Sequence, residues 1–164
     1  MSSINYFHSQ FKREEPRTDV SFGINDNGVL AYTTPLDENV IAEVTNNNCR
    51  SIQFTPIDHN IIITENGNER SQCDGMLYIE ATKELIFIEM KDCNKDWINE
   101  AVEQLKSTIT HFSSNHIVAD FKKRSAYAAN KQRPFFQYSK KELAEVFRNQ
   151  TKFRLNITNK IVIK

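Results

Sequence analysis

Two apolar runs in the middle of the chain have charged residues at their ends. Residues 73–80 (CDGMLYIE) and 84–91 (ELIFIEMK) are rich in aliphatic and aromatic residues and are separated by a short turn. Runs of this length predict the two strands of a buried hairpin. Asp74 lies at the start of the first run, and Glu89 and Lys91 lie at the end of the second. Charged side chains are rarely buried without a partner or a metal ion, so these three residues are candidates for function.

The N-terminal half predicts a hairpin, a helix and two strands before this pair. The helix, at residues 35–48, is indicated by a proline suited to a first helical turn, early acids and closing asparagines. The hairpin is indicated by NDNG between two apolar segments. The predicted hairpin strands are residues 20–24 and 29–34, and the two later strands are residues 50–57 and 60–64.

The C-terminal half predicts two helices and two extended segments. Apolar residues in 94–112 recur at helical spacing, with Asn94 or Asp96 available as the N-cap. The second helix, at residues 139–150, opens with a capping box of Ser139 and Glu142. Residues 124–130 predict a strand, and residues 153–164 predict a strand or a hairpin.

This order predicts a mixed α/β fold, in which a central mixed β-sheet is flanked by helices and carries an N-terminal hairpin and a C-terminal helix-strand extension. The 164 residues suit a single domain spanning 1–164. No apolar run approaches the roughly 18 residues of a membrane span, so no membrane partner is expected. The three cysteines are an odd count without a CxxC pair, which favours free thiols in a reducing cytoplasm.

The hairpin register decides whether the three charged residues meet. Glu89 and Lys91 are two residues apart in one strand and therefore share a face. If Glu80 faces Lys83 or Leu85, Asp74 joins them on that face, whereas pairing of Glu80 with Glu84 would direct Asp74 to the other side. We predict the shared face, or a bulge that restores it. The alternative is a solvated Glu–Lys ion pair at a strand end, with Asp74 serving the turn before Gly75.

A shared face would suit metal-assisted phosphodiester hydrolysis. Two carboxylates supply the hard oxygen ligands that Mg²⁺ prefers, and the ion also binds substrate phosphate. A bound ion lowers the pKa of water and neutralises charge developing on the phosphorus centre. A neighbouring lysine can orient the water and offset negative charge.

Asp74, a gap of 14 residues and then Glu89-Met90-Lys91 resembles the PD-(D/E)XK nuclease superfamily, whose restriction-endonuclease-like core matches the order predicted from residue 37 to residue 130. The resemblance implies Mg²⁺, or Mn²⁺ in its place, held by Asp74, Glu89 and the Met90 carbonyl, with Lys91 as the catalytic lysine. It further implies assisting roles for a glutamate on the first core helix and for a glutamine on the helix after the motif. The residues at those two positions are Glu43 and Gln104.

Two features depart from the motif of that superfamily. Cys73 stands where the proline before the first aspartate is expected. Asp58 does follow a Pro-x pair and is a rival for the acidic role, although the strand predicted at residues 60–64 separates it from Glu89.

Charge is distributed unevenly although the net charge is zero. Residues 1–114 hold 9 Lys/Arg and 18 Asp/Glu, whereas residues 115–164 hold 12 and 3. The two parts could attract each other within the fold, or the basic part could bind a polyanion. Aromatic residues accompany the basic ones, which suits a nucleic-acid backbone, although lysines also protect edge strands from aggregation. The candidate nucleic-acid-binding residues are Lys122, Lys123, Arg124, Lys131 and Arg133.

Together these patterns predict a Mg²⁺-dependent nuclease that acts on nucleic acid, with DNA favoured over RNA. Cutting both strands of a duplex would favour a homodimer. Two alternatives stay open: a non-cleaving nuclease-fold module that binds nucleic acid, and a module of the phage accessory or immunity type that binds a protein partner.

Overall fold

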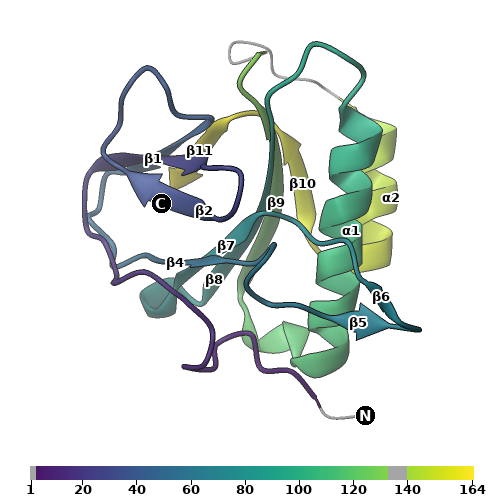
Figure 1. The fold of residues 1–164 in the computed structure, drawn as a ribbon. Coiled ribbons are helices and arrows are strands. Elements are labelled where there is room, and N and C mark those ends of the chain that lie inside the picture. Colours follow the sequence, from purple (N-terminus) through teal and green to yellow (C-terminus); the bar gives the residue numbers. More distant parts are fainter. Residues whose placement is uncertain (1–2, 133–139) are drawn as a thin grey trace.

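The computed structural model describes residues 3–132 and 140–164, which form two large β-sheets and two helices (Figure 1). The helices are α1 (Ile98–Asn115) and α2 (Lys141–Thr151), with 3-10 turns at Glu80–Thr82 and Val118–Asp120. The strands are β1 (Ser21–Asp26), β2 (Ala31–Thr34), β3 (Ala42–Asn46), β4 (Gln53–Pro56), β5 (Thr64–Glu65), β6 (Asn68–Glu69), β7 (Gly75–Ile79), β8 (Glu84–Lys91), β9 (Lys123–Asn130), β10 (Arg154–Ile157) and β11 (Lys160–Ile163).

The larger sheet has five strands in the order β10-β9-β8-β7-β4. From the β10 edge inward, β10, β9 and β8 are parallel to one another, β7 pairs antiparallel with β8, and β4 at the other edge pairs antiparallel with β7. Helix α1 makes the crossover from β8 to β9 that a parallel pair requires. The predicted α/β class, the mixed sheet and the hairpin of β7 and β8 are therefore confirmed.

The smaller sheet has four strands in the order β11-β3-β1-β2. Its β1 and β2 form the predicted N-terminal hairpin. The helix predicted at residues 35–48 is wrong, because this segment instead supplies strand β3. In β3 the buried Ala42, Val44 and Asn46 alternate with half-buried residues, which is the period of a strand with one face in a core. The proline and early acid belong to a turn, in which the Asp37 side chain accepts the Asn39 N–H (2.7 Å).

The two sheets pack face to face, and both helices cover the opposite face of the larger sheet (Figure 1). Strand β8 shows the division: Leu85 and Phe87 belong to the core under the helices, whereas Ile86 and Ile88 belong to the core between the sheets. Helices therefore flank the larger sheet on one face, and the smaller sheet, which includes β3 in place of the helix predicted at residues 35–48, covers the other.

The C-terminal part confirms the two predicted helices but not every detail. Trp97 rather than Asn94 or Asp96 occupies the N-cap position of α1, and no side chain caps that end by a hydrogen bond. Ser139, predicted as the cap of α2, lies outside the described residues. The last two strands are not a hairpin, because β10 pairs with β9 in one sheet and β11 pairs with β3 in the other.

The segment between β4 and β7 differs from the predicted strand at residues 60–64. Ile61 and Ile63 are buried in the helix-side core as parts of a loop. A short hairpin of β5 and β6 follows, with Asn66 and Gly67 at positive φ in its turn. No helix within the described ranges is long and apolar enough to cross a membrane.

Candidate active site

The hairpin of β7 and β8 brings Asp74 beside Glu89. The regular ladder ends at Gly75 opposite Ile88, and the Asp74 N–H also donates to the Ile88 carbonyl, at 3.1 Å, so Asp74 stands one step out of that register, as in a β-bulge. Glu89 alternates with Ile88 and therefore lies on the face of Phe87, which packs under the helices. The carboxyl groups of Asp74 and Glu89 contact each other, so the shared face expected from the sequence, through a bulge, is confirmed.

Both carboxyl groups lie at the buried edge of this face. The exposed fractions of Asp74 and Glu89 are 8% and 2%. The Met90 backbone N–H donates to Asp74 Oδ2 at 2.7 Å, which fixes the aspartate against the end of β8.

Lys91 joins Glu89 to helix α1. Its Nζ lies 3.2 Å from Glu89 Oε2 and 2.9 Å from Glu100 Oε1. The same ammonium group donates to Gln104 Oε1 at 2.7 Å. The structure therefore brings together Asp74, Glu89, Lys91 and Gln104, and it adds Glu100.

Burial dominates the electrostatics of the acids. It raises the pKa of Glu89 well above its ordinary value, and the charge of Asp74 raises it further against the opposing effect of Lys91. Burial also raises the pKa of Asp74 to about 6, although the Met90 N–H acts in the opposite direction. Burial alone would lower the pKa of Lys91, but its contacts with Glu100 and Glu89 outweigh burial and raise it. Two acids beside one cation thus retain protons that exposed acids would lose.

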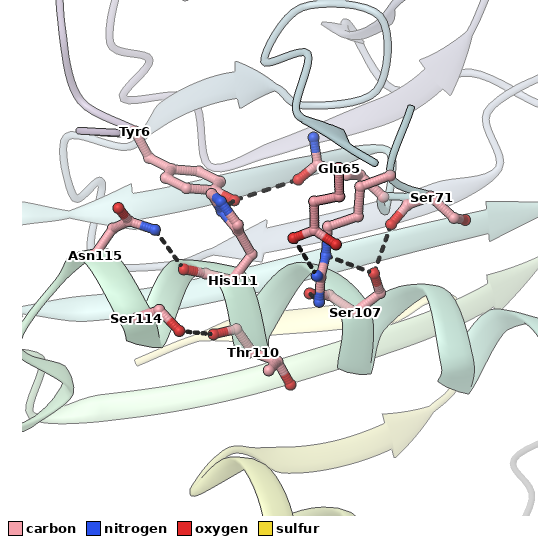
Figure 2. A network of polar contacts seen from close by, with 10 residues as sticks. Tyr6, Glu65, Ser71, Ser107, Thr110, His111, Ser114 and Asn115 are labelled. Atoms are coloured by element: carbon pink, nitrogen blue, oxygen red, sulfur yellow. Dashed lines mark hydrogen bonds and ion pairs between the residues drawn. The ribbon is translucent and has the colours of Figure 1, made fainter. Parts of the chain in front are cut away.

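Helix α1 is tied to the segment immediately before Asp74. The Cys73 N–H donates to the Thr108 hydroxyl at 2.7 Å in a buried contact. One residue earlier in the helix, the Ser107 hydroxyl donates to the Ser71 carbonyl at 2.7 Å, as Figure 2 shows. These bonds fix the position of α1 along its axis relative to β7. They therefore also fix the positions of Glu100 and Gln104, the two helix residues that contact Lys91.

A second group of contacts in the same view extends this attachment. The Tyr6 hydroxyl is 2.8 Å from His111 Nδ1 on the next turn of α1, and it also contacts Gln72 (Figure 2). The Arg70 guanidinium donates to the Ser107 hydroxyl at 3.1 Å. The N-terminal segment, the loop before β7 and α1 are therefore connected on one side of the carboxylate pair.

The residues at this position fit a hard divalent cation. Glu89 Oε1 is buried and accepts no hydrogen bond from an amide, hydroxyl or ammonium donor in the structure, which is uncommon for a buried oxygen. Its carboxyl group is close enough to that of Asp74 to share a proton in the absence of a cation. A residue's N–H and C=O face the same neighbour in an antiparallel ladder, so the Met90 carbonyl faces Asp74 as its N–H does. Two carboxylates and a carbonyl leave positions for water and phosphate, as Mg²⁺ requires. Within the described ranges no three His, Cys, Asp or Glu side chains form a metal-binding group.

Glu43 does not join this cluster. It lies on β3 of the smaller sheet, opposite Lys160 of β11 and Gly23 of β1. Because it alternates with Val44, which is buried between the sheets, its side chain lies on the outer face. Its expected place depended on the helix that the structure replaces with a strand.

Two further acids, which sequence reasoning did not place at the site, affect the pKa of Asp74. The charges of Asp26, at the end of β1, and of Asp58, after β4, both raise the pKa of Asp74. Asp26 also lines a cavity of about 470 Å³ with Lys91 and Lys131. Asp58 is the rival noted from its Pro-x pair, whereas Asp26 carried no local signal, because only the packing of the two sheets brings β1 to this edge.

The predicted basic run is divided between the two ends of the larger sheet. Strand β9 is parallel to β8, with Lys123 opposite Glu84 and Asn130 opposite Lys91. Lys122, Lys123 and Arg124 therefore lie seven residues from the site along β8, from 84 to 91, or about 23 Å at about 3.3 Å per residue.

Lys131 is the member of the basic run at the site end. Its N–H donates to the Lys91 carbonyl at 2.9 Å. Arg133 lies outside the described residues.

Comparisons of this chain with protein-family models, with curated proteins and with solved structures found no match.

Proposed function

We propose that this protein is a Mg²⁺-dependent nuclease with a restriction-endonuclease-like core. The observation that carries the proposal is the buried pair of Asp74 and Glu89 beside Lys91, in which Glu89 Oε1 accepts no hydrogen bond from an amide, hydroxyl or ammonium donor. Burying two acids together raises the free energy of the folded state, and a divalent cation would convert that arrangement into a stable binding site.

The residues of the chain would divide the work. Asp74, Glu89 and the Met90 carbonyl would hold the ion, which would supply an activated water and neutralise phosphate charge. Lys91 would orient that water toward phosphorus and donate to a phosphate oxygen. Gln104, already within 2.7 Å of the Lys91 ammonium, would position the lysine when Glu89 turns to the metal.

The core proposed for this activity is the unit from β7 through β8 and α1 to β9. Two features support it: the charged residues lie on adjacent strands, and the helix after the motif packs on the face that they share. The N-terminal part departs from the superfamily pattern because β3 stands in place of the first helix. The proposed core therefore begins at β7 rather than at residue 37.

One observation favours a second function, a nuclease-fold module that binds nucleic acid without cutting it. The Lys91 ammonium is shared among Glu89, Glu100 and Gln104. In this arrangement it offsets the charge of Glu89, as a metal ion would. An inactive module could retain such a lysine as a permanent replacement for the cation.

Cleavage assays separate the two functions. Labelled single-stranded and double-stranded DNA and RNA are incubated with Mg²⁺ or Mn²⁺. We expect metal-dependent cleavage by the wild type and a loss of at least 100-fold in Lys91→Ala and Glu89→Gln. Lys106→Ala is the matched control, because Lys106 also pairs with a glutamate, Glu103 at 3.1 Å, but lies away from the acids.

Each outcome of these assays decides between the functions. Cleavage by Lys91→Ala at the control rate would refute the assignment of the site. Binding of nucleic acid by the wild type with no cleavage in either metal would favour the non-cleaving module.

A further inference from the structure

A second charged pocket lies at the opposite end of the larger sheet from the acids. It is a cavity of about 620 Å³ lined by seven Lys or Arg side chains and one carboxylate, Glu84. Sequence reasoning found three of the seven, Lys122, Lys123 and Arg124. The others come from the end of α2 and from the last two strands, and include Arg148 and Arg154.

The pocket forms where the larger sheet extends past the edge strand of the smaller sheet. Ala126 of β9 and Leu155 of β10 face the helices, so Tyr127 and Arg154 face the other way. The smaller sheet ends at β11, whose exposed Val162 lines the pocket rather than covering it. The outer part of the larger sheet is thus left as the floor of a concavity.

The cations of this pocket are not balanced by acids. Among the residues that the structure describes, Lys122, Arg148 and Arg154 form no ion pair. The remaining residues, 1–2 and 133–139, contain no Asp or Glu. The Arg124 guanidinium donates to the carbonyls of Val118 and Lys152 at 2.9 and 3.2 Å, which neutralises no charge.

Folded surfaces ordinarily intersperse charges of both signs. A concavity lined by one sign focuses its field and attracts the opposite charge. Arginine guanidinium groups match phosphate oxygens in pairs, and two of the exposed cations here are arginines. These features favour a ligand with several phosphates over an isolated anion.

We propose that this pocket binds backbone phosphates of the nucleic acid whose scissile bond lies at Asp74 and Glu89, an inference that takes its ligand from the proposed function. The pocket and the acids lie on opposite faces of the larger sheet, and the five residues from Glu84 to Glu89 span about 17 Å along β8. At about 3.4 Å per nucleotide along one strand, the bound phosphates lie at least about five nucleotides from the cleavage position. The pocket then sets a minimum substrate length.

Binding without metal tests this proposal separately from catalysis. Fluorescent 30-mer DNA, single-stranded and duplex, is titrated in EDTA at several salt concentrations. The test variant is K122Q/R148Q/R154Q, three exposed cations of the pocket. The matched control, K12Q/K141Q/K160Q, removes the same charge from exposed lysines outside it. We expect the slope of log Kd against log salt on duplex to fall by about 2 to 3 in the test variant and to change little in the control.

Length dependence and competition complete the test. In Mg²⁺ the wild type should cut a 30-mer with a higher kcat/KM than an 8-mer, and the test variant should lose that preference while still cutting the 8-mer. Equal slopes in the two triple variants, or no binding of DNA by the wild type, would overturn the proposal. Displacement of DNA by polyglutamate of equal charge as readily as by unlabelled DNA would also overturn it. Absence of cleavage in every variant, with the slope difference intact, would remove the nuclease and leave the phosphate site.

Discussion

Replacing Asp74 with asparagine should stabilise the metal-free protein at neutral and alkaline pH. The substitution keeps the size of the side chain, and its amide oxygen can still accept the Met90 N–H now bound at 2.7 Å. Its amide nitrogen can donate to the neighbouring Glu89. The change therefore removes one buried charge while preserving the local hydrogen bonds.

The magnitude follows from the pKa of the aspartate. Burial raises the pKa of Asp74 from 3.8 to about 6, and each pH unit corresponds to about 1.4 kcal/mol of free energy. Ionised Asp74 therefore destabilises the folded state by about 3 kcal/mol. In a carboxyl whose folded pKa is raised, the folded state binds more protons than the unfolded state between the two pKa values, so stability falls as pH rises from 3.8 to about 6. Below that window the destabilisation is absent, and above it the full amount remains.

Differential scanning calorimetry or urea unfolding in EDTA measures this effect. At pH 8 we expect the free energy of unfolding of Asp74→Asn to exceed that of the wild type by about 2 to 3 kcal/mol. For a chain of this size that corresponds to a rise of roughly 4 to 12 °C in Tm. Near pH 4 the two proteins should be equally stable. Removing the aspartate charge also lowers the pKa of Glu89, which acts in the same direction. Asp37→Asn, at an exposed position, is the control, because asparagine can still accept the Asn39 N–H, and it should change the Tm at pH 8 much less than Asp74→Asn does.

Two results would refute this reasoning. A gain in stability of equal size at both pH values would mean that the charge of Asp74 is not its origin. A loss of stability at pH 8 would mean that the carboxylate, through its bond to the Met90 N–H, stabilises the fold more than burial of its charge destabilises it.

Three further predictions concern the same region. Millimolar Mg²⁺ or Mn²⁺ should stabilise the folded wild type, by about 2.7 kcal/mol at 100 times Kd, and so raise its Tm. The Tm of Glu89→Gln should stay unchanged, and equal shifts in the two proteins would place the ion elsewhere. Thr108→Val should cost about 1 to 3 kcal/mol in urea unfolding, because it leaves the buried Cys73 N–H unpaired; a cost below 0.5 kcal/mol would refute it. Gly75→Ala should cost about 3 kcal/mol by the same assay, because the new Cβ would lie 2.5 Å from Phe54 Cζ, and Phe54→Leu should recover part of that cost.

Sequence patterns predicted the hairpin and the long helix because both depend on local signals. The apolar run that ends in Glu89 and Lys91 and the helical spacing up to Gln104 are set within a few residues of each site side chain. The register was not fixed by the apolar pattern, because β8 is buried on both faces, and it depends instead on the turn between Ile79 and Glu84.

The segment around Glu43 misled sequence reasoning because its signals conflict. Pro35 and the following acids are typical of a helix start, but the alternation of Ala42, Val44 and Asn46 fits a strand. The available partner decided the outcome: β1 and β11 offer two strands on either side of this segment, so pairing satisfies its backbone groups. The paired residues of β11 are 117 positions away, so this partner cannot be seen from the segment itself.

Basic residues that are close together in the sequence are far apart in the fold. Lys122 and Lys131 are nine residues apart in one basic run, yet the parallel pairing of β8 and β9 places them at opposite ends of the sheet. The acids accumulate at one end, where Asp26 and Asp58 add to Asp74, and the cations of α2 and β10 accumulate at the other. A polyanion is repelled from the acidic end unless a cation is bound there, whereas the basic end attracts it in all conditions. Binding at the basic pocket should therefore not depend on metal. Placement of the scissile phosphate at the acids should depend on it.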